Sequence, residues 1–474
     1  MPDSTAPSRQ SKKAHRRNDV PSEPLGLQAW LVLGGFAFLA AMLGGSSRPD
    51  ALQMAFLRPL AALFFIPALW HLRTRQVQEA WLPVLLLAAL ALWMALQLVP
   101  LPPSIWHSLP GRAVVAEIDA LLGEADRWRP LSLVPSRTVN ALASLAVPAS
   151  ALLLALAYRM RGVHLLLMIA SVGVLDAALG LGQVITGRSS PLYFYEVTNR
   201  GSPVGVLANE NHSAVLSAVS LLAIARLAIG ARALEAPQWA RFVYVPAYVL
   251  VLLAVLVSGS RAGIALAGLA ILVTALIAWH AVRSSSSQSR SAHRAESAPR
   301  PRLLLGAFAV AIALMVAAFF LLERTPAFED LLARNAFEDL RARIWPSLTE
   351  MMSTFWFLGS GFGSFEEVYH IFEPTALLLP SYVNQAHNDW AQLVIEGGLP
   401  AIALLVILLG WIASTIRQLF ARGGQSMQRA LFWMALIAIL AAASIVDYPL
   451  RTPIFQVLGV WLLVVLARDR SAAR

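Results

Sequence analysis

Twelve stretches of the chain are apolar, nearly free of charge and close to the length that a helix needs to cross a bilayer. A transmembrane helix takes about 20 mostly apolar residues. The pattern predicts an all-α integral membrane protein of about 12 transmembrane helices, because a helix satisfies its own backbone hydrogen bonds inside lipid. The stretches are 27–47, 51–71, 81–99, 138–158, 163–185, 206–226, 242–258, 261–282, 303–322, 393–416, 430–447 and 453–467.

The composition excludes a soluble multidomain enzyme. Hydrophobic residues make up 58% of the 474 positions and charged residues 14%, against about 45–50% and about 25% in soluble domains. The net charge of +10 does not predict a nucleic-acid partner, since that requires basic residues clustered on a water-exposed face. The absence of cysteine excludes disulfides, thiolate metal ligands and thiol nucleophiles.

The loop charges predict how the helices are oriented. If the N-terminus is cytoplasmic, the inside segments hold 23 of the 37 basic residues but only 7 of the 27 acidic ones. Basic residues favour the cytoplasmic side of short loops. We therefore expect a multi-pass membrane protein with both termini in the cytoplasm.

The predicted helices divide the chain into four parts. Residues 1–26 are expected to form a disordered cytoplasmic tail, and 27–322 the first nine transmembrane helices. Residues 323–392 are expected to form a large, partly helical loop on the outward side, and 393–474 the last three transmembrane helices with a short cytoplasmic tail. Long structured loops often carry function, so we expect any chemistry to face outward.

Two polar groups lie at the outward ends of predicted helices. Near the start of the sixth span lie the polar residues Asn209, Glu210, Asn211 and His212. The turn Ser258-Gly-Ser-Arg261 places an arginine at the start of the eighth span. An arginine beside the free N–H groups of a helix N-terminus favours an anion. The alternatives are a snorkelling arginine that sets the depth of the span and asparagines that only cap a helix.

The large loop adds the other candidate residues. His387 directly precedes the tenth span and is suited to general-base chemistry, because the histidine pKa lies near neutrality. Asn388 follows it, and Asn388 could equally be a helix cap. Glu396 either orients His387 or faces the loop.

Several familiar kinds of site are absent from the sequence. The glycine run at 359–363 lacks the lysine and Ser/Thr of a phosphate loop, so a flexible turn is the better interpretation. No zincin-type histidine pair, Asp-x-Asp pair or Gly-x-Ser-x-Gly motif is present, so we predict neither a metal site nor a serine hydrolase.

Two ionisable residues inside spans keep a rival function open. Arg58 and Asp176 are of the kind that transporters use, so a transporter or flippase of lipid-linked sugars is the alternative. Such proteins have inverted repeats, and the two halves of this sequence show no convincing repeat.

Taken in order, the motifs resemble those of the O-antigen ligase and O-antigen polymerase superfamily of bacterial membrane glycosyltransferases. The shared features are the Asn209-Glu-Asn211 group, the turn ending in Arg261, Arg341-x-x-x-Trp345, the glycine run, His387-Asn388 with Glu396-Gly397, and two further turns. These turns are Trp128-Arg-Pro-Leu-Ser-Leu and Asp447-Tyr-Pro-Leu-Arg451-x-Pro453. The resemblance covers roughly residues 50–465.

The resemblance implies a GT-C-like fold in the bacterial inner (plasma) membrane, a catalytic motif in a periplasmic loop at 323–392, and a reaction. A glycan would pass from undecaprenyl diphosphate to an acceptor hydroxyl at the periplasmic face, by metal-independent inversion and without a cofactor. The acceptor would be the lipid A core for a ligase or a lipid-linked repeat unit for a polymerase, and the motifs do not choose between them. Lipopolysaccharide and exopolysaccharide pathways both fit, and membrane lipid and a chain-length regulator are further expected partners.

The resemblance also assigns residues. His387 would take the acceptor's proton, while Arg261 and Arg341 would stabilise the diphosphate leaving group, since arginine suits phosphate through paired N–H donors. The expected substrate-binding residues are Arg343, Asn209, Asn211, His212, Asn388 and Glu396.

Overall fold

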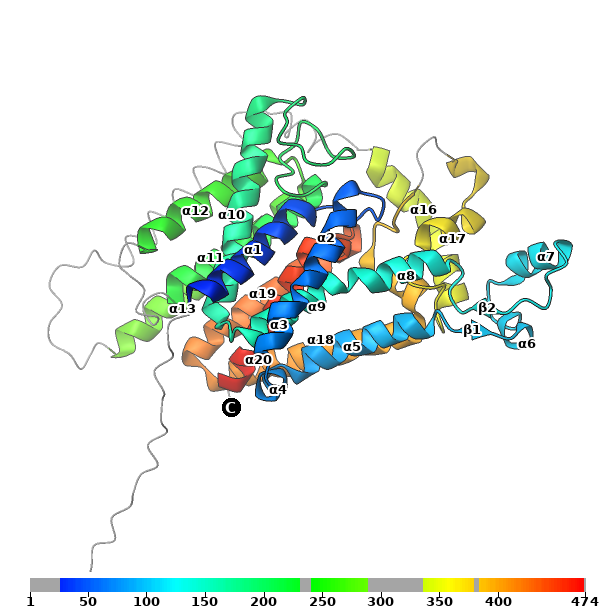
Figure 1. Ribbon diagram of the computed structural model, residues 1–474. Helices are drawn as coiled ribbons and strands as arrows, with labels where there is room; N and C mark the ends of the chain where they lie inside the picture. The colour runs from blue at the N-terminus through cyan, green and yellow to red at the C-terminus, as the bar shows by residue number, and fades with distance from the viewer. Residues whose placement is uncertain (1–25, 231–239, 289–335, 379–382, 473–474) are drawn as a thin grey trace, which may run out of the picture.

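The computed structural model is a bundle of long helices (Figure 1) and describes residues 26–230, 240–288, 336–378 and 383–472. The first part of the bundle comes from the N-terminal half of the chain. Its helices are α1 (Leu27–Leu43), α2 (Leu52–Leu63), α3 (Phe65–His71), α4 (Thr74–Glu79), α5 (Trp81–Leu96), α6 (Pro103–Trp106), α7 (Ala113–Leu121), α8 (Pro135–Ser144), α9 (Ala146–Ala157), α10 (Gly162–Thr186) and α11 (Glu210–Gly230).

The second part completes the bundle around α11, which is the most buried of the long helices. Its helices are α12 (Ala240–Val257), α13 (Arg261–Gln288), α16 (Ala336–Phe355), α17 (Phe365–Phe372), α18 (Asp389–Arg422), α19 (Gly424–Val446) and α20 (Pro453–Ala472), with 3₁₀ turns η2 (Thr375–Leu377) and η3 (Pro449–Arg451). The described strands are β1 (Pro100–Leu101) and β2 (Arg129–Pro130), which pair antiparallel.

The expectation of an all-α membrane protein is confirmed, whereas the count of twelve spans is not established. Within the described residues, seven helices are long and apolar enough to cross a membrane, and three apolar helices are shorter. Eleven of the twelve predicted stretches coincide with helices. The ninth, 303–322, and the predicted tail up to residue 25 lie outside the described residues.

Several boundaries differ from the predicted ones; the span at 138–158, for example, is divided at Leu145 into α8 and α9. The span at 51–71 is divided at Phe64 into α2 and α3, and Pro59 lies inside α2, where a proline removes a helical hydrogen bond. Helix α18 begins at Asp389, inside the segment 323–392 that we expected to be loop. The reason is that Asn388 caps it by accepting a hydrogen bond from the amide of Ala391.

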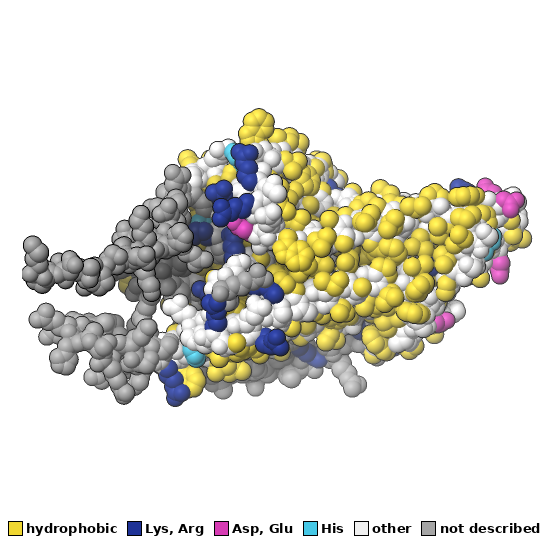
Figure 2. All heavy atoms as spheres, turned by 90° about the horizontal axis from the view of Figure 1, so that it is seen from below, with side chains coloured by type: hydrophobic (Ala, Val, Ile, Leu, Met, Phe, Trp, Pro, Cys, Tyr) yellow, Lys and Arg dark blue, Asp and Glu magenta, His cyan; other side chains and the backbone are white. Residues whose placement is uncertain are grey.

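Charged side chains gather at the ends of the described part, as Figure 2 shows. On the visible face, Lys and Arg collect where α4 and the C-terminal end of α20 lie, and acidic groups collect at the tip formed by α6 and α7. Apolar side chains cover much of the surface between them. This distribution fits helices that cross an apolar medium between two polar ones.

Candidate functional site

The carboxylate of Asp447 is the centre of a polar cluster built from four helices. Asp447 follows the last residue of α19, and its side chain is only 2% exposed. Its oxygens lie 3.5 Å from His212 Nε2, 3.6 Å from His387 Nδ1 and 3.6 Å from Arg341 Nη2. The Asn211 amide donates a hydrogen bond of 3.0 Å to it. Side chains from α11, α16 and the start of α18 therefore converge on a residue that the sequence had not singled out as a site residue.

The cluster keeps Asp447 ionised. Burial alone would raise the pKa of this carboxyl, but its electrostatic interactions with His212, and then with His387, outweigh burial and hold the pKa well below its usual value. Beside it, burial and then the Asp447 charge raise the pKa of the Tyr448 phenol. A fixed negative charge and a neutral phenol thus lie against the two histidines.

His387 is held in an uncommon backbone conformation. Its φ is +50°, a left-handed value that non-glycine residues rarely adopt and that persists only when neighbours enforce it. Asn388 fixes the following residues, since its Oδ1 caps α18 and its Nδ2 donates to the carbonyl of Ile445. The imidazole lies edge-on to the ring of Tyr448, with 4.9 Å between centroids.

The orientation of the imidazole decides which nitrogen can act. His387 Nδ1 faces Asp447 and is buried, while the side chain as a whole is 17% exposed. Nε2 is therefore the nitrogen that a substrate proton can reach. A carboxylate behind the other ring nitrogen fixes the tautomer and stabilises the protonated ring.

The two arginines of α16 are separated by the geometry of the helix. Residues two apart on a helix point in nearly opposite directions. Arg341 reaches Asp447, and its buried Nε has no partner within the described part. Arg343 is exposed and contacts the carbonyl of Ala376 at 3.5 Å, so the structure does not bring Arg343 into the Asp447 cluster.

The first turns of α11 and α13 meet at the same place. Asn209 Oδ1 accepts from the amide of Asn211, which is a capping contact. Asn211 Oδ1 in turn accepts from Ser260 Oγ at 2.8 Å, directly before Arg261. The sequence-predicted residues Asn209, Asn211, His212 and Arg261 are thus assembled around one helix junction.

Glu396 contacts Arg451 rather than His387, and so lies outside the group of side chains that contact Asp447. Its side chain is fully buried, and Oε2 lies 2.9 Å from Arg451 Nη1. Arg451 also lies 3.5 Å from Asp389, the first residue of α18. This ion pair ties α18 to η3, the turn that follows Asp447.

The glycine run is a packed turn, not the flexible turn that the sequence suggested. Pro400 cannot donate to the Glu396 carbonyl, and α18 is kinked at Gly398, where φ is +60°. The amide of Gly361 donates to the freed Glu396 carbonyl, and the amide of Ser360 to that of Ile395. A Cβ at Gly359 would meet the Glu396 oxygen at 2.2 Å, so the close approach requires glycine.

The two ionisable residues inside spans have different surroundings. Asp176 accepts hydrogen bonds from the amide of Val206 and from Ser213 Oγ, so it joins α10 to α11 and the preceding loop. Arg58 bonds to Asn140 Oδ1. Across the described residues, no group of three or more His, Asp or Glu side chains has the arrangement of a metal site.

Asp447, Tyr448 and Arg451 are the residues that sequence reasoning missed as site residues. All three lie in the Asp447–Pro453 turn, which had entered only as a feature of the resemblance. An aspartate between two apolar helices, four residues before an arginine, was the available signal. What the turn contacts could not be read from it.

The fold and the cluster define a multi-pass membrane protein with a buried polar site at one end of its helix bundle. Residues 246–406 match the family model described as O-antigen ligase, so the resemblance to the O-antigen ligase and polymerase superfamily is confirmed for this part of the chain. The match covers about a third of the chain and includes Arg261, Arg341 and His387. None of the curated proteins compared matches the chain.

Proposed function

We propose that the protein transfers a glycan from undecaprenyl diphosphate to an acceptor sugar hydroxyl at the periplasmic face of the bacterial inner membrane. The superfamily indicates an enzyme that acts on lipid-linked glycans in general. The observation that carries the proposal is the convergence of His387 and Arg341 on the buried Asp447 carboxylate. The reaction needs a base and a phosphate-binding group close together, and the Asp447 carboxylate holds one of each.

His387 supplies the base. The acceptor hydroxyl loses its proton to Nε2 as its oxygen attacks the anomeric carbon. The carbon–oxygen bond to the diphosphate breaks on the opposite face, so the configuration inverts. Asp447 stabilises the imidazolium that forms, because it stays ionised and faces Nδ1.

Arginine stabilises the leaving group. The departing diphosphate carries concentrated negative charge, which guanidinium groups bind through paired donors. Arg341 has an unpaired Nε beside the cluster, and Arg261 begins α13 next to the Ser260–Asn211 contact. We assign leaving-group stabilisation to these two, without a metal ion.

The remaining candidates would hold the substrate or the site. Asn209, Asn211 and His212 lie where sugar or phosphate hydroxyls would approach, and Asn388 positions His387. Glu396 acts through Arg451, which it holds against α18. Arg343 faces away from the cluster, so we place it at the edge of the substrate-binding region.

The test is transfer in vitro by the purified full-length protein. Lipid-linked oligosaccharide is supplied with either lipid A core or a second lipid-linked repeat unit, with and without EDTA. Transfer to the core identifies a ligase and lengthening of the repeat a polymerase, and EDTA should leave the rate unchanged. Movement of the lipid across vesicles without any new glycosidic bond would instead support the flippase alternative.

The proposed orientation has its own test. Because the chain contains no cysteine, single cysteines report topology without further changes. Glu117→Cys in α7 and Arg75→Cys in α4 are both at exposed positions. A membrane-impermeant maleimide should label Glu117→Cys in spheroplasts and Arg75→Cys only after lysis, and the reverse pattern would contradict the orientation.

A further inference from the structure

Arg58 is a cation inside a membrane span that the proposed chemistry does not use. It lies in α2, within the apolar segment Leu52–His71. An arginine in a bilayer is costly unless an anion or water reaches it. Its one described hydrogen bond goes to the neutral amide oxygen of Asn140, and its buried Nε has no partner within the described ranges.

No carboxylate of the described part compensates this charge. The nearby outer segments contain Asp50, Glu366 and Glu367, but these are already held by other arginines. Arg48 pairs with Asp50, and Arg137 pairs with both glutamates.

The depth of Arg58 suits a lipid-borne group. Six residues separate it from Leu52, the first residue of α2, which corresponds to about 9 Å along the helix. Asn140 is five residues into α8, so the pair lies at a similar depth on two adjacent helices. The loop before α2 contacts the residues after Asp447, since Gly44 accepts from the amide of Ile454. Arg58 is therefore on the same end of the bundle as the candidate site.

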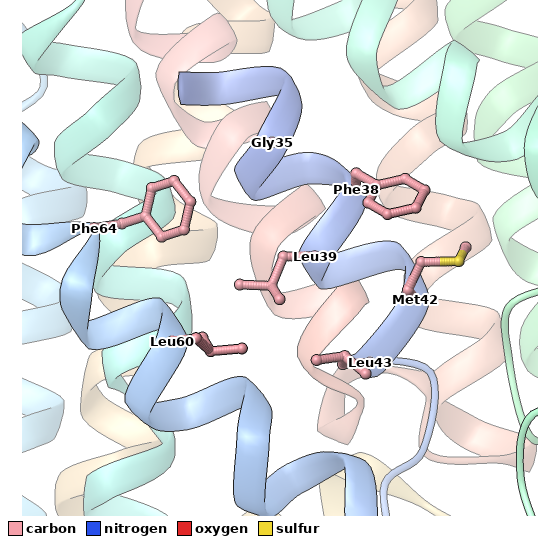
Figure 3. A pocket seen from close by; sticks show the side chains of 7 residues that line it. All are labelled: Gly35, Phe38, Leu39, Met42, Leu43, Leu60 and Phe64. Atoms are coloured by element: carbon pink, nitrogen blue, oxygen red, sulfur yellow. The ribbon is translucent and has the colours of Figure 1, made fainter. Parts of the chain in front are cut away.

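An apolar groove lies between α1 and the C-terminal end of α2 (Figure 3). It has a volume of about 390 Å³ and is lined by α1 side chains together with Leu60 and Phe64. Successive helix residues point about 100° apart. Arg58 therefore points toward α8, Pro59 toward the outer surface and Leu60 toward the groove. Pro59 is exposed on that surface. One lipid lying across Pro59 could thus reach both Arg58 and the groove.

We infer that Arg58, held by Asn140, binds the phosphate of a lipid-linked substrate whose hydrocarbon tail lies in the α1–α2 groove. The chemistry fits both parts of such a molecule: a guanidinium for the phosphate and an apolar wall for the tail. The inference rests on the proposed function for the identity of the lipid, a polyprenyl diphosphate. Arg58 would position the substrate from the membrane side, with the reaction at Asp447.

The test measures lipid binding, not transfer. The full-length protein in phosphatidylcholine nanodiscs is titrated with undecaprenyl diphosphate, in three variants and the wild type. Arg58→Gln should weaken binding by about tenfold or more, as expected for a lost charge-assisted hydrogen bond. Arg58→Lys should bind more tightly than Arg58→Gln. Arg127→Gln, which removes an exposed arginine near α7, is the matched control and should bind like the wild type.

Thermal stability separates binding from a structural role. An uncompensated charge does not stabilise the fold, so Arg58→Gln should melt no lower than the wild type. A clear fall in melting temperature, or unchanged affinity in Arg58→Gln, would overturn the inference.

Competing ligands identify the source of the phosphate. Equal binding of phosphatidylglycerol would show a general headgroup site, and equal binding of inorganic pyrophosphate would show that the tail contributes nothing; either result contradicts the inference. If the wild type binds polyprenyl diphosphate through Arg58 but transfers no glycan, the proposed function fails and the lipid site stands.

Discussion

Two buried aspartates at opposite ends of α20 show how the same residue types make a structural contact in one place and a candidate site in the other. Asp447 precedes α20 and Asp469 lies in its last turns. Pro453, where α20 begins, and Asp469 are separated by roughly 24 Å of helix. Helices α11 and α19 also contribute to both clusters, with one end to each.

We call the cluster at Asp469 closed because its charged groups already make direct hydrogen bonds to one another. Arg226 Nη2 lies 2.9 and 2.7 Å from its two carboxylate oxygens, and Trp433 donates a third bond of 2.8 Å. The Arg226 guanidinium also lies 4.7 Å above the ring of Phe432. Direct hydrogen bonds and ring contacts on one ion pair are typical of a contact that holds helices together.

We call the cluster at Asp447 open because most of its charged groups lie near the carboxylate without a direct hydrogen bond to it. Its two histidines and Arg341 stop at 3.5–3.6 Å. Among the described residues, only Asn211 makes a shorter side-chain contact from another helix, at 3.0 Å. Polar groups that are gathered but not directly bonded can still engage a substrate, whereas those at Asp469 are already engaged. The difference teaches that the contacts of an ion pair, more than its composition, indicate whether it belongs to a site.

The largest effect should come from the base at the open cluster. His387→Ala should reduce glycan transfer by about 10²–10⁴-fold, the usual contribution of general-base catalysis, while membrane insertion stays normal. The measurement is in vitro transfer together with the yield of monodisperse protein. His370→Ala, at an exposed histidine of α17, is the control and should transfer normally. Full activity in His387→Ala would contradict the assignment of His387 as the general base.

The next effect distinguishes the two aspartates by activity. Asp447→Asn keeps the shape of the side chain but removes the charge behind His387. Transfer should fall by about 10²-fold, the lower end of what base assistance contributes. The rate is measured under saturating donor, and the melting temperature is recorded in parallel. A protein that loses stability without losing transfer would show that Asp447, too, is only structural.

The converse holds at the closed cluster. Asp469→Asn should lower the free energy of unfolding by on the order of 2 kcal/mol, because it leaves Arg226, whose side chain is only 17% exposed, without its charged partner. Reversible denaturation in detergent measures the loss. Transfer per folded molecule should be unchanged, so a selective loss of transfer would contradict the comparison.

The smallest effect tests the division between the α16 arginines. Arg341→Lys should slow transfer by about tenfold, because lysine lacks the paired donors that suit a phosphate. Arg343→Lys should change the rate by less than about twofold, because exposed arginine contacts contribute little. Initial rates on the same donor compare the two. Equal losses would mean that both arginines reach the substrate.

Several site residues could be predicted from the sequence because their local surroundings are distinctive. His387 stands between a polar loop and an apolar span, and Asn209–His212 open another span, so polarity at the mouth of a helix was visible without a structure. Arg341 and Arg343 could not be told apart, since both lie in one charged run and only the helix phase separates them.

Asp447 could not be found in this way. It is 60 residues from His387, 106 from Arg341 and 235 from His212, and a contact over such separations depends on how the helices pack. From the sequence, Glu396 could either orient His387 or face the loop, yet the kink at Gly398 and the turn at Arg451 give it another partner.

The sequence by itself determined that this is a multi-pass helical membrane protein, because long apolar stretches can satisfy their backbone groups in lipid only as helices. It also indicated the family that the chain resembles, through motifs that are local in the chain. Only the tertiary structure decided which charges meet. Packing brings together the ends of helices that are distant in sequence, and it leaves Asp469 closed, Asp447 open and Arg58 without a carboxylate partner among the described residues.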